Sequence, residues 1–358
     1  MRIEQHLKAT LRELAAEARG VDELARSAMI HGVRMRRRRR LAVATGAAAL
    51  LIVALAPFAL KRASSQEIVV GPSASASPSV REVSEVEPRR LAGGWMLVGM
   101  DNWVLNREAN SYTRLRTDRS ESQYLPSPTG NLAAMVSPDR EANQDLIEFV
   151  TTAGAPLHAV RLRTNGVYQW SPGGDRLVTG AWAVADPRLG TGFGFAIVDA
   201  RTGRVSSHRV DTLRFDCSMC TFAWSRDGSQ VALGITNRRG EGSELFAGVQ
   251  FFDARTGEPA RAMPLRAMFS GPYSWSPNGR YVIAQTDGLK REFELVDTSS
   301  FESRPFPYDA VFVTDDVLLA VDASTIVAMR PDGTVVDRFE LAGEFRDLGA
   351  AATFGPPS

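Results

Sequence analysis

Few residues of this 358-residue chain have a type and spacing that could carry out chemistry. Its two cysteines form the pair Cys217-Ser-Met-Cys220, and only His158 and His208 of its four histidines lie beyond residue 90. A Cys-x-x-Cys pair with redox activity usually opens a helix after a strand, whereas this pair leads directly into a short β-like run at residues 221–224. A structural disulfide is therefore favoured, with free thiols and redox or metal chemistry as the alternatives.

The common catalytic motifs are missing from the sequence. It contains no G-x-S-x-G nucleophile elbow, no H-E-x-x-H zinc motif and no Walker loop. Gly190, Gly192 and Gly194 match part of a phosphate-binding loop, but no properly spaced third glycine and no helix follow them. They indicate a long hairpin loop, and the two histidines are expected on the surface of outer strands. We therefore expect no catalytic residue, no metal site and no cofactor.

A long uncharged segment separates a basic N-terminal region from the rest of the chain. Residues 1–40 carry a net charge of +6, residues 41–60 have no charged side chain, and residues 93–358 carry a net charge of −6. Twenty apolar residues in a helix span ~30 Å, the thickness of a bilayer core. The segment predicts one transmembrane helix over residues 41–60, within an anchor region of residues 36–62.

The charges beside this segment predict its orientation. Six arginines, Arg34 and Arg36 to Arg40, precede it, and only Lys61 and Arg62 follow it closely. Because positive flanks stay in the cytoplasm, the N-terminus is expected inside and the large body outside, on a single-pass protein of the cell membrane. A cleaved signal peptide is the alternative, although it would need a very long n-region and no A-x-A site follows residue 60 directly.

The regions on either side of the anchor differ in pattern. In residues 1–35, Ile3, Leu7 and Leu11 recur at helical spacing, which predicts a short helical tail. This cytoplasmic tail either docks a cytosolic partner through residues 1–31 or only sets the topology. Residues 63–92 include the run GPSASASPS and predict an extended linker.

Residues 93–358 contain an internal repeat. An aromatic residue followed by a serine turn recurs four times, with the shared serines at Ser127, Ser171, Ser225 and Ser276. The sequence Asp-Ala-Arg-Thr-Gly occurs at residues 199–203 and again at residues 253–257, each time 28 residues after its serine. Two turn signals held at one offset are typical of a repeated supersecondary unit.

Each repeat predicts four short antiparallel strands. Ser-Pro-Asn-Gly favours a type I turn closed by a glycine with positive φ, and Asp-Ala-Arg-Thr-Gly favours a second hairpin turn. The tryptophans that precede three of the serines are expected in the core between repeats. Four-stranded units of 40 to 55 residues are typical of β-propeller blades.

This pattern resembles the WD-repeat-like propeller blades of the TolB type, in which an aromatic-Trp-Ser-Pro-Asp-Gly turn precedes an apolar strand and an Asp-x-x-x-Gly turn. The resemblance covers about 260 residues and implies an all-β propeller, while it implies little about function. A short blade over residues 95–115 and a degenerate blade over residues 311–341 bring the count to about six. A β-sandwich is the alternative fold.

The two ends of the repeat region predict how the ring closes. Residues 95–115 supply three strands without a leading aromatic strand, and an apolar run is left over near the C-terminus. A strand within residues 345–354 is therefore expected to pair beside this first blade. Closure with strands from both ends removes an exposed sheet edge.

One face of the propeller is the candidate for ligand binding. The connections after the second and fourth strands of every blade share this face, and they include the cysteine pair and the two longest loops, residues 183–194 and 236–245. Long loops on a rigid scaffold often carry binding residues. The candidates are Trp182, Arg188, Phe193, Met219, Arg238 and Arg239, with Cys217 and Cys220 as a possible disulfide. The alternative is that these are ordinary solvated loop residues.

Charge and motifs together restrict the function classes. A net charge of +1 and a pI near 7.8 argue against a nucleic-acid partner. The predicted function is a membrane-anchored extracytoplasmic β-propeller that acts as a non-catalytic binding scaffold for a protein or envelope ligand. The alternatives are a propeller hydrolase acting on lactones or glycans, and a signal relay through the tail in the manner of an anti-sigma factor. A zinc-type anti-sigma tail is excluded because His31 has no cysteine near it.

Overall fold

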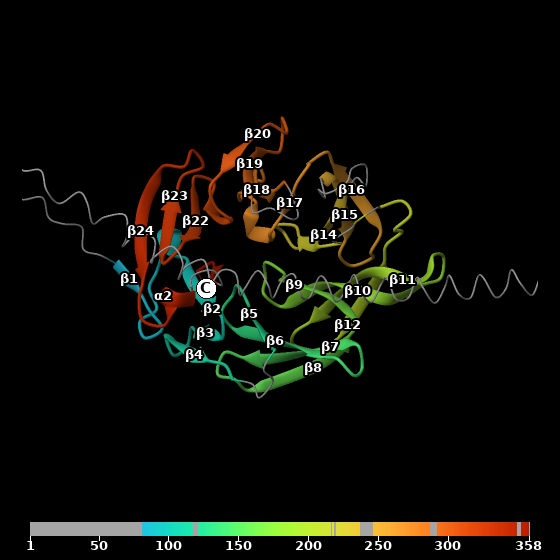
Figure 1. Ribbon diagram of the computed structural model, residues 1–358, viewed down its shortest axis with the longest axis horizontal. Coiled ribbons are helices and arrows are strands. Elements are labelled where there is room, and N and C mark those ends of the chain that lie inside the picture. Colours follow the sequence, from blue (N-terminus) through green and yellow to red (C-terminus); the bar gives the residue numbers. More distant parts are fainter. Residues whose placement is uncertain are drawn as a thin grey trace, which may run out of the picture. The chain divides into compact units, whose positions relative to one another are not determined.

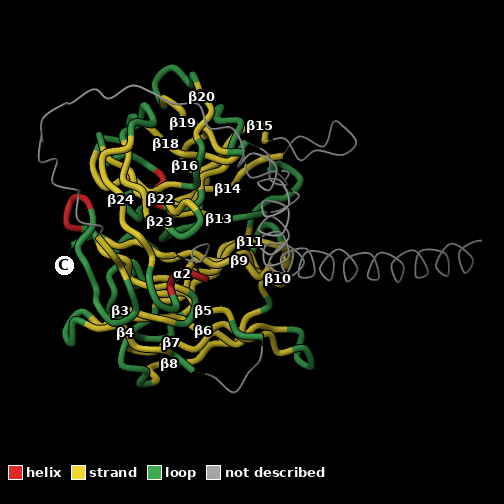
Figure 2. The backbone as a smooth tube through the Cα atoms, turned by 60° about the vertical axis from the view of Figure 1, so that its left-hand side comes forward, coloured by secondary structure: helices red, strands yellow, loops and turns green. Residues whose placement is uncertain are grey.

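Six small sheets follow one another along the chain and form a ring (Figure 1). The computed structural model describes residues 81–116, 121–215, 217, 220–236, 246–286, 292–348 and 352–357. Strands dominate these residues, and the helical turns are η1 (Ala92–Gly94), η2 (Pro272–Ser274) and α2 (Phe345–Leu348) (Figure 2). The structure confirms the predicted all-β, six-bladed propeller.

The predicted membrane anchor at residues 36–62 lies outside the described residues, as do the tail at residues 1–35 and residues 63–80 of the linker. Within the described ranges, no helix has the length and apolar character needed to cross a bilayer.

The first three blades are four-stranded sheets in which neighbouring strands pair antiparallel. Blade 1 consists of β25 (Ala352–Gly355), β2 (Met96–Met100), β3 (Trp103–Asn106) and β4 (Ser111–Arg114). Blade 2 consists of β5 (Gln123–Pro126), β6 (Leu132–Asp139), β7 (Gln144–Thr151) and β8 (Pro156–Leu162). Blade 3 consists of β9 (Thr164–Trp170), β10 (Arg176–Asp186), β11 (Gly190–Asp199) and β12 (Val205–Arg209).

The last three blades continue in the same direction around the ring. Blade 4 consists of β13 (Phe222–Trp224), β14 (Gln230–Thr236), β15 (Phe246–Asp253) and β16 (Pro259–Met263). Blade 5 consists of β17 (Met268–Phe269), β18 (Tyr281–Gln285), β19 (Phe293–Asp297) and β20 (Ser303–Phe306). Blade 6 consists of β21 (Ala310–Thr314), β22 (Val317–Asp322), β23 (Thr325–Met329) and β24 (Val335–Leu341), with β1 (Arg81–Val83) added outside β24.

The four serine turns join the first and second strands of blades 2 to 5. The closing glycine donates its N–H to the carbonyl oxygen of the serine at 2.9 to 3.0 Å in every copy. These glycines have φ between +67° and +72°, in the left-handed region that favours glycine. The hydroxyls of Ser171, Ser225 and Ser276 each accept a backbone N–H from five residues later, so the serine fixes the start of the second strand.

The tryptophans before three of these serines lie between blades, as predicted. Trp170, Trp224 and Trp275 are 7%, 0% and 6% exposed. The Nε1 of Trp224 donates to Gln169 O of blade 3 at 3.1 Å, and that of Trp170 donates to Leu125 O of blade 2 at 2.9 Å. Each of these two indoles therefore joins its blade to the one before it.

The Asp-Ala-Arg-Thr-Gly turns join the third and fourth strands and contact the fourth strand of the preceding blade. The Nε2 of His158 in β8 lies against Arg201 O, in the turn of blade 3. One blade later, His208 in β12 lies against Thr256 and Gly257, and its ring is 5.0 Å from that of Phe195. The prediction of two surface histidines was therefore wrong for His208, which is half-buried between blades.

Burial of His208 makes the stability of the propeller depend on pH. Desolvation lowers the pKa of His208 below its usual value, although the Thr256 backbone and the Asp253 carboxylate oppose this shift. At pH values between this lowered pKa and the pKa of ~6.5 that His208 has in the unfolded chain, the unfolded chain binds more protons than the folded one. The free energy of unfolding therefore falls as the pH falls through this range. We expect His208→Gln to reduce the loss of melting temperature between pH 7 and pH 5 by a few °C, on the order expected for one titrating group. Calorimetry of both proteins at pH 7 and pH 5 checks this, and an equal loss of melting temperature in the wild type and His208→Gln would contradict it.

The ring closes as predicted, with a C-terminal strand in the first blade. Strand β25 pairs antiparallel with β2, so that Phe354 lies opposite Leu97. The Nη2 of Arg107 in blade 1 donates to Pro356 O at 2.6 Å. A side chain at Gly355 would meet Pro128 O of blade 2 at 1.7 Å, so only glycine allows the last strand to approach the neighbouring blade this closely.

Two elements differ from the sequence-based expectation. The linker was predicted to extend to residue 92, but β1 pairs in parallel with β24 from Arg81↔Phe339 to Val83↔Leu341. Blade 5 was predicted to have an aromatic strand leading directly into Ser276, but β17 ends at Phe269, η2 begins at Pro272, and beyond η2 only a Trp275↔Val282 bridge pairs with β18. Proline lacks the N–H that a ladder needs and suits the first turn of a helix, which explains the break.

Candidate binding face

The predicted long loop at residues 183–194 is mostly β-structure. The β10–β11 ladder continues to the pair Asp186↔Gly190, which leaves only three residues at the tip. A bulge lies between Ala181 and Val184, and Ala183 within it has φ of +59°. A bulge bends a strand and redirects its side chains, so this hairpin changes direction where a simple loop was expected.

The bulge places an aromatic side chain at the surface. Trp182 is 41% exposed, and its backbone N–H donates to Arg163 O at 2.8 Å, which ties the bulge to the connection between blades 2 and 3. The Trp182 ring lies 4.7 Å from the Phe193 ring in an edge-to-face contact. Trp182 is therefore an exposed aromatic residue with a fixed backbone and a supported ring.

Phe193 supports this surface from below. It is only 5% exposed, and its ring stacks on that of Phe222 of blade 4 with the centroids 5.9 Å apart. Phe193 and Cys217 belong to one buried apolar cluster. Phe193 was predicted as a binding residue, but it is buried, because β11 is covered on both faces from Phe193 to Val198.

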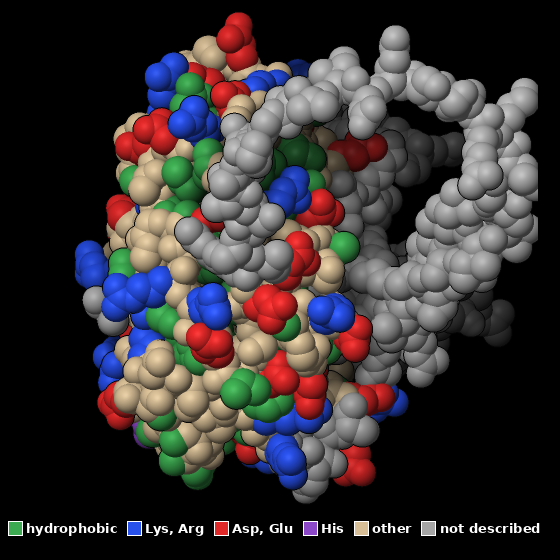
Figure 3. Space-filling view, turned by 90° about the vertical axis from the view of Figure 1, so that its left-hand side faces the viewer, with side chains coloured by type: hydrophobic (Ala, Val, Ile, Leu, Met, Phe, Trp, Pro, Cys, Tyr) green, Lys and Arg blue, Asp and Glu red, His purple; other side chains and the backbone are tan. Residues whose placement is uncertain are grey.

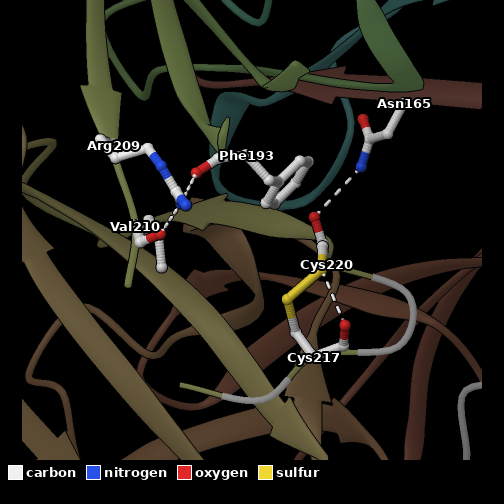
Figure 4. The surroundings of a disulfide bond; sticks show 6 residues. All are labelled: Asn165, Phe193, Arg209, Val210, Cys217 and Cys220. Atoms are coloured by element: carbon white, nitrogen blue, oxygen red, sulfur yellow. Dashed lines mark hydrogen bonds between the residues drawn. A yellow bond between two sulfur atoms is a disulfide. The ribbon is translucent and has the colours of Figure 1, made fainter. Parts of the chain in front are cut away.

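The two cysteines form a disulfide in the connection between blades 3 and 4 (Figure 4). Cys217 is 8% exposed, and Cys220 is half-buried with φ of +45°. The Nδ2 of Asn165, near the start of β9, donates to Cys220 O at 3.1 Å. Cys220 is thus held against blade 3. Arg163, which precedes β9 in the same region, accepts the backbone N–H of Trp182.

The charged residues at the tip of the hairpin contact one another and blade 4. The N–H groups of Leu189 and Arg188 bond Asp186 and lower the pKa of its carboxyl group. The Nη1 of Arg188 lies 3.9 Å from Glu258 Oε1 in blade 4, and both side chains are exposed, so this ion pair is weak. The structure therefore does not bring the predicted residue Arg188 to Trp182.

Three of the predicted candidates, Met219, Arg238 and Arg239, lie outside the described residues. Asn165 was not predicted, although the Asn165-Gly166 dipeptide is a turn signal that could have indicated a bend near the disulfide. In the part of the chain that the structure describes, no group of three or more His, Cys, Asp or Glu side chains is placed to hold a metal ion.

We call Trp182, Phe193, Asn165, Cys217 and Cys220 the Trp182 platform. These residues offer an aromatic ring and backbone groups, and no pair of titratable side chains lies among them. Such a surface can bury apolar area against a partner. On the side of the propeller in Figure 3, acidic and basic side chains are interspersed without a large area of one sign.

Comparison with known proteins finds similar folds without assigning a family. Neither a protein-family model nor a curated protein matches the chain. One similar solved structure is a putative TolB from Agrobacterium tumefaciens, with 14% identity, 72% of this chain and 99% of that chain covered, and a TM-score of 0.41. Another is the Myceliophteria thermophila Cps50 (Swd1) β-propeller domain, with 12% identity, coverage of 74% and 89%, and a TM-score of 0.42. A chain of the mitotic checkpoint complex is also similar, with 11% identity, coverage of 78% and 88%, and a TM-score of 0.42.

Proposed function

We propose that this protein is a membrane-anchored, extracytoplasmic β-propeller that binds a protein or envelope ligand without catalysis. The observation that carries the binding role is Trp182, an aromatic side chain 41% exposed and supported by Phe193. Rigid exposed aromatic residues lose little entropy on binding and are enriched at the centres of interfaces. The proposal assigns no cofactor, no metal and no nucleic acid to the protein.

The sequence supports the membrane part of this proposal. The uncharged residues 41–60 follow six arginines and precede a Pro/Ser/Ala-rich linker. Positive flanks orient a single helix with the N-terminus in the cytoplasm, which leaves the propeller outside. The cytoplasmic residues 1–31 are then available to a cytosolic partner.

A topology reporter tests the anchor. A periplasmic-type phosphatase fused after Ser65 is expected to be active, because the anchor carries this position out of the cytoplasm. Replacing Arg36 to Arg40 with glutamine is expected to lower that activity several-fold, because it removes most of the charge bias. A neutral-to-neutral change within residues 72–79 of the linker is the control. Activity of a cytoplasmic reporter at Ser65 in the unchanged protein would contradict the orientation.

Site-specific crosslinking tests the binding role. A photoreactive amino acid at position 182 is expected to give a discrete adduct in cells, and the same group at Leu157 on β8, which is 39% exposed, serves as the control. With the adduct partner purified, Trp182→Ala is expected to weaken binding at least tenfold, whereas Leu157→Ala should leave it unchanged. Equal adducts at both positions, or equal affinities of the two variants, would exclude Trp182 as the contact.

A further inference from the structure

We propose that the Cys217–Cys220 disulfide is a site of thiol–disulfide exchange with a dithiol reductant, and that its oxidation state controls the rigidity of the Trp182 platform. This regulation of the binding face rests on the proposed function, because it matters to the protein only if the platform binds a ligand.

The disulfide contributes little to the global fold. Its two cysteines are three positions apart, and the stabilisation from a disulfide grows with the length of the loop that it closes. It lies in a connection between β12 and β13, outside every strand ladder. A bond that closes such a short loop has a local effect, so it can be broken without opening the propeller.

The disulfide instead stabilises a backbone conformation of Cys220 that is intrinsically unfavourable. Cys220 has φ of +45°, in the left-handed region that is unfavourable for residues with a side chain. The disulfide and the Asn165 Nδ2 bond to Cys220 O, 3.1 Å long, both hold this conformation. When the S–S bond breaks, the backbone can return to negative φ, which turns the carbonyl oxygen away from Asn165.

Two contacts carry this change to the binding face. Asn165 Oδ1 also accepts the N–H of Val167 at 3.2 Å, so the side chain that binds Cys220 O also fixes the β9 backbone two residues later. Cys217 lies in the buried cluster that contains Phe193, and the Phe193 ring lies 4.7 Å from Trp182. We therefore expect reduction to loosen the Asn165 contact with Cys220 and the packing of the cluster beneath Phe193.

The exposure of the two cysteine residues indicates the order of the chemical steps. Cys220 is half-buried and Cys217 is only 8% exposed, so a thiolate of the reductant attacks Cys220 Sγ. The S–S bond breaks, Cys217 leaves as a thiolate and takes up a proton, and a mixed disulfide forms at Cys220. The second thiol of the reductant then displaces Cys220, which also becomes a thiol. The reductant becomes a disulfide, and two electrons and two protons pass to the protein.

The test uses the full chain with dithiothreitol as the reductant. Labelling with maleimide under native conditions is expected to rise from zero to two thiols per chain, because the chain has two cysteines and both are in this bond. Hydrogen exchange at the Val167 amide is expected to become at least tenfold faster. The Gly174 and Gly228 amides, which close serine turns, should change less than twofold.

Two variants make the result specific to the disulfide. The double change Cys217→Ser with Cys220→Ser is expected to show the fast Val167 exchange without reductant and no further response to it. Asn165→Ala is expected to show fast exchange at Val167 in both redox states, with the disulfide still formed. Neither variant needs a ligand, so this test can fail while the crosslinking test of the binding role succeeds.

Three results would overturn the proposal. The first is a disulfide that resists dithiothreitol in the folded protein. The second is reduction that leaves Val167 exchange within twofold of the oxidised value. The third is loss of the β-sheet circular dichroism signal on reduction, because the bond would then support the whole fold.

Discussion

Deleting residues 352–358 is expected to abolish cooperative folding of the propeller. The deletion removes β25, which takes away the pairing partner of β2, the buried Phe354 ring and the Arg107 bond to Pro356 O. Loss of a buried phenylalanine alone costs ~3–5 kcal/mol, and each lost hydrogen bond adds ~1 kcal/mol. This sum approaches the ~5–15 kcal/mol by which a typical domain is stable.

Circular dichroism melting and size-exclusion chromatography check this expectation. The truncated protein should show no sharp thermal transition and should aggregate, because the edge of β2 becomes available to other chains. A chain that ends after Pro357 keeps β25 and is the control. Equal melting temperatures for the two truncations would show that the C-terminal strand does not close the ring.

Replacing Trp224 with alanine is expected to have the second largest effect. The side chain is 0% exposed, its Nε1 donates to Gln169 O, and the Arg176 guanidinium lies 4.7 Å from its ring centroid. A cavity of this size in a core typically costs ~3–5 kcal/mol. For a domain of this length, that loss lowers the melting temperature by on the order of 10 °C.

Trp182→Ala is the matched control for this change. It removes the same side chain from the preceding blade, but from a site where the indole is 41% exposed and makes no side-chain hydrogen bond among the described residues. We expect its cost to be below ~1.5 kcal/mol, mainly from the contact with Phe193. If the two variants had the same melting temperature, the tryptophans before the serines would not be the main links between blades.

The fold was predictable because its turns repeat at fixed offsets. Each serine turn ends with a glycine of positive φ, and each Asp-Ala-Arg-Thr-Gly turn begins with an aspartate that accepts backbone N–H groups. Both requirements are local, so they can be recognised in the sequence. Four such serine turns determine four blades. The fourth strand of blade 1 could be predicted because only three strands were found in residues 95–115, and a blade with three strands would leave an exposed sheet edge in the ring.

The candidate site was less predictable because it depends on contacts between distant segments. Periodicity does not indicate that residues 183–194 continue as strands, because a bulge interrupts the alternation at Trp182. Arg188 reaches Glu258 only because the hairpin bends toward blade 4. Strand β1 was missed because three residues at the end of a Pro/Ser-rich linker give no periodic signal, and only the free edge of β24 makes them a strand.

Ring closure also determines when the protein can finish folding. Leu97 in β2 finds its partner, Phe354 in β25, only after nearly the whole propeller has been synthesised. Contacts between residues so far apart in sequence slow folding, because the entropy of closing the chain must be overcome before they form. During synthesis, the first blade therefore remains a three-stranded sheet with an open edge, and this intermediate is prone to aggregation. A slow, late folding phase that depends on the C-terminal strand is the kinetic signature of this architecture.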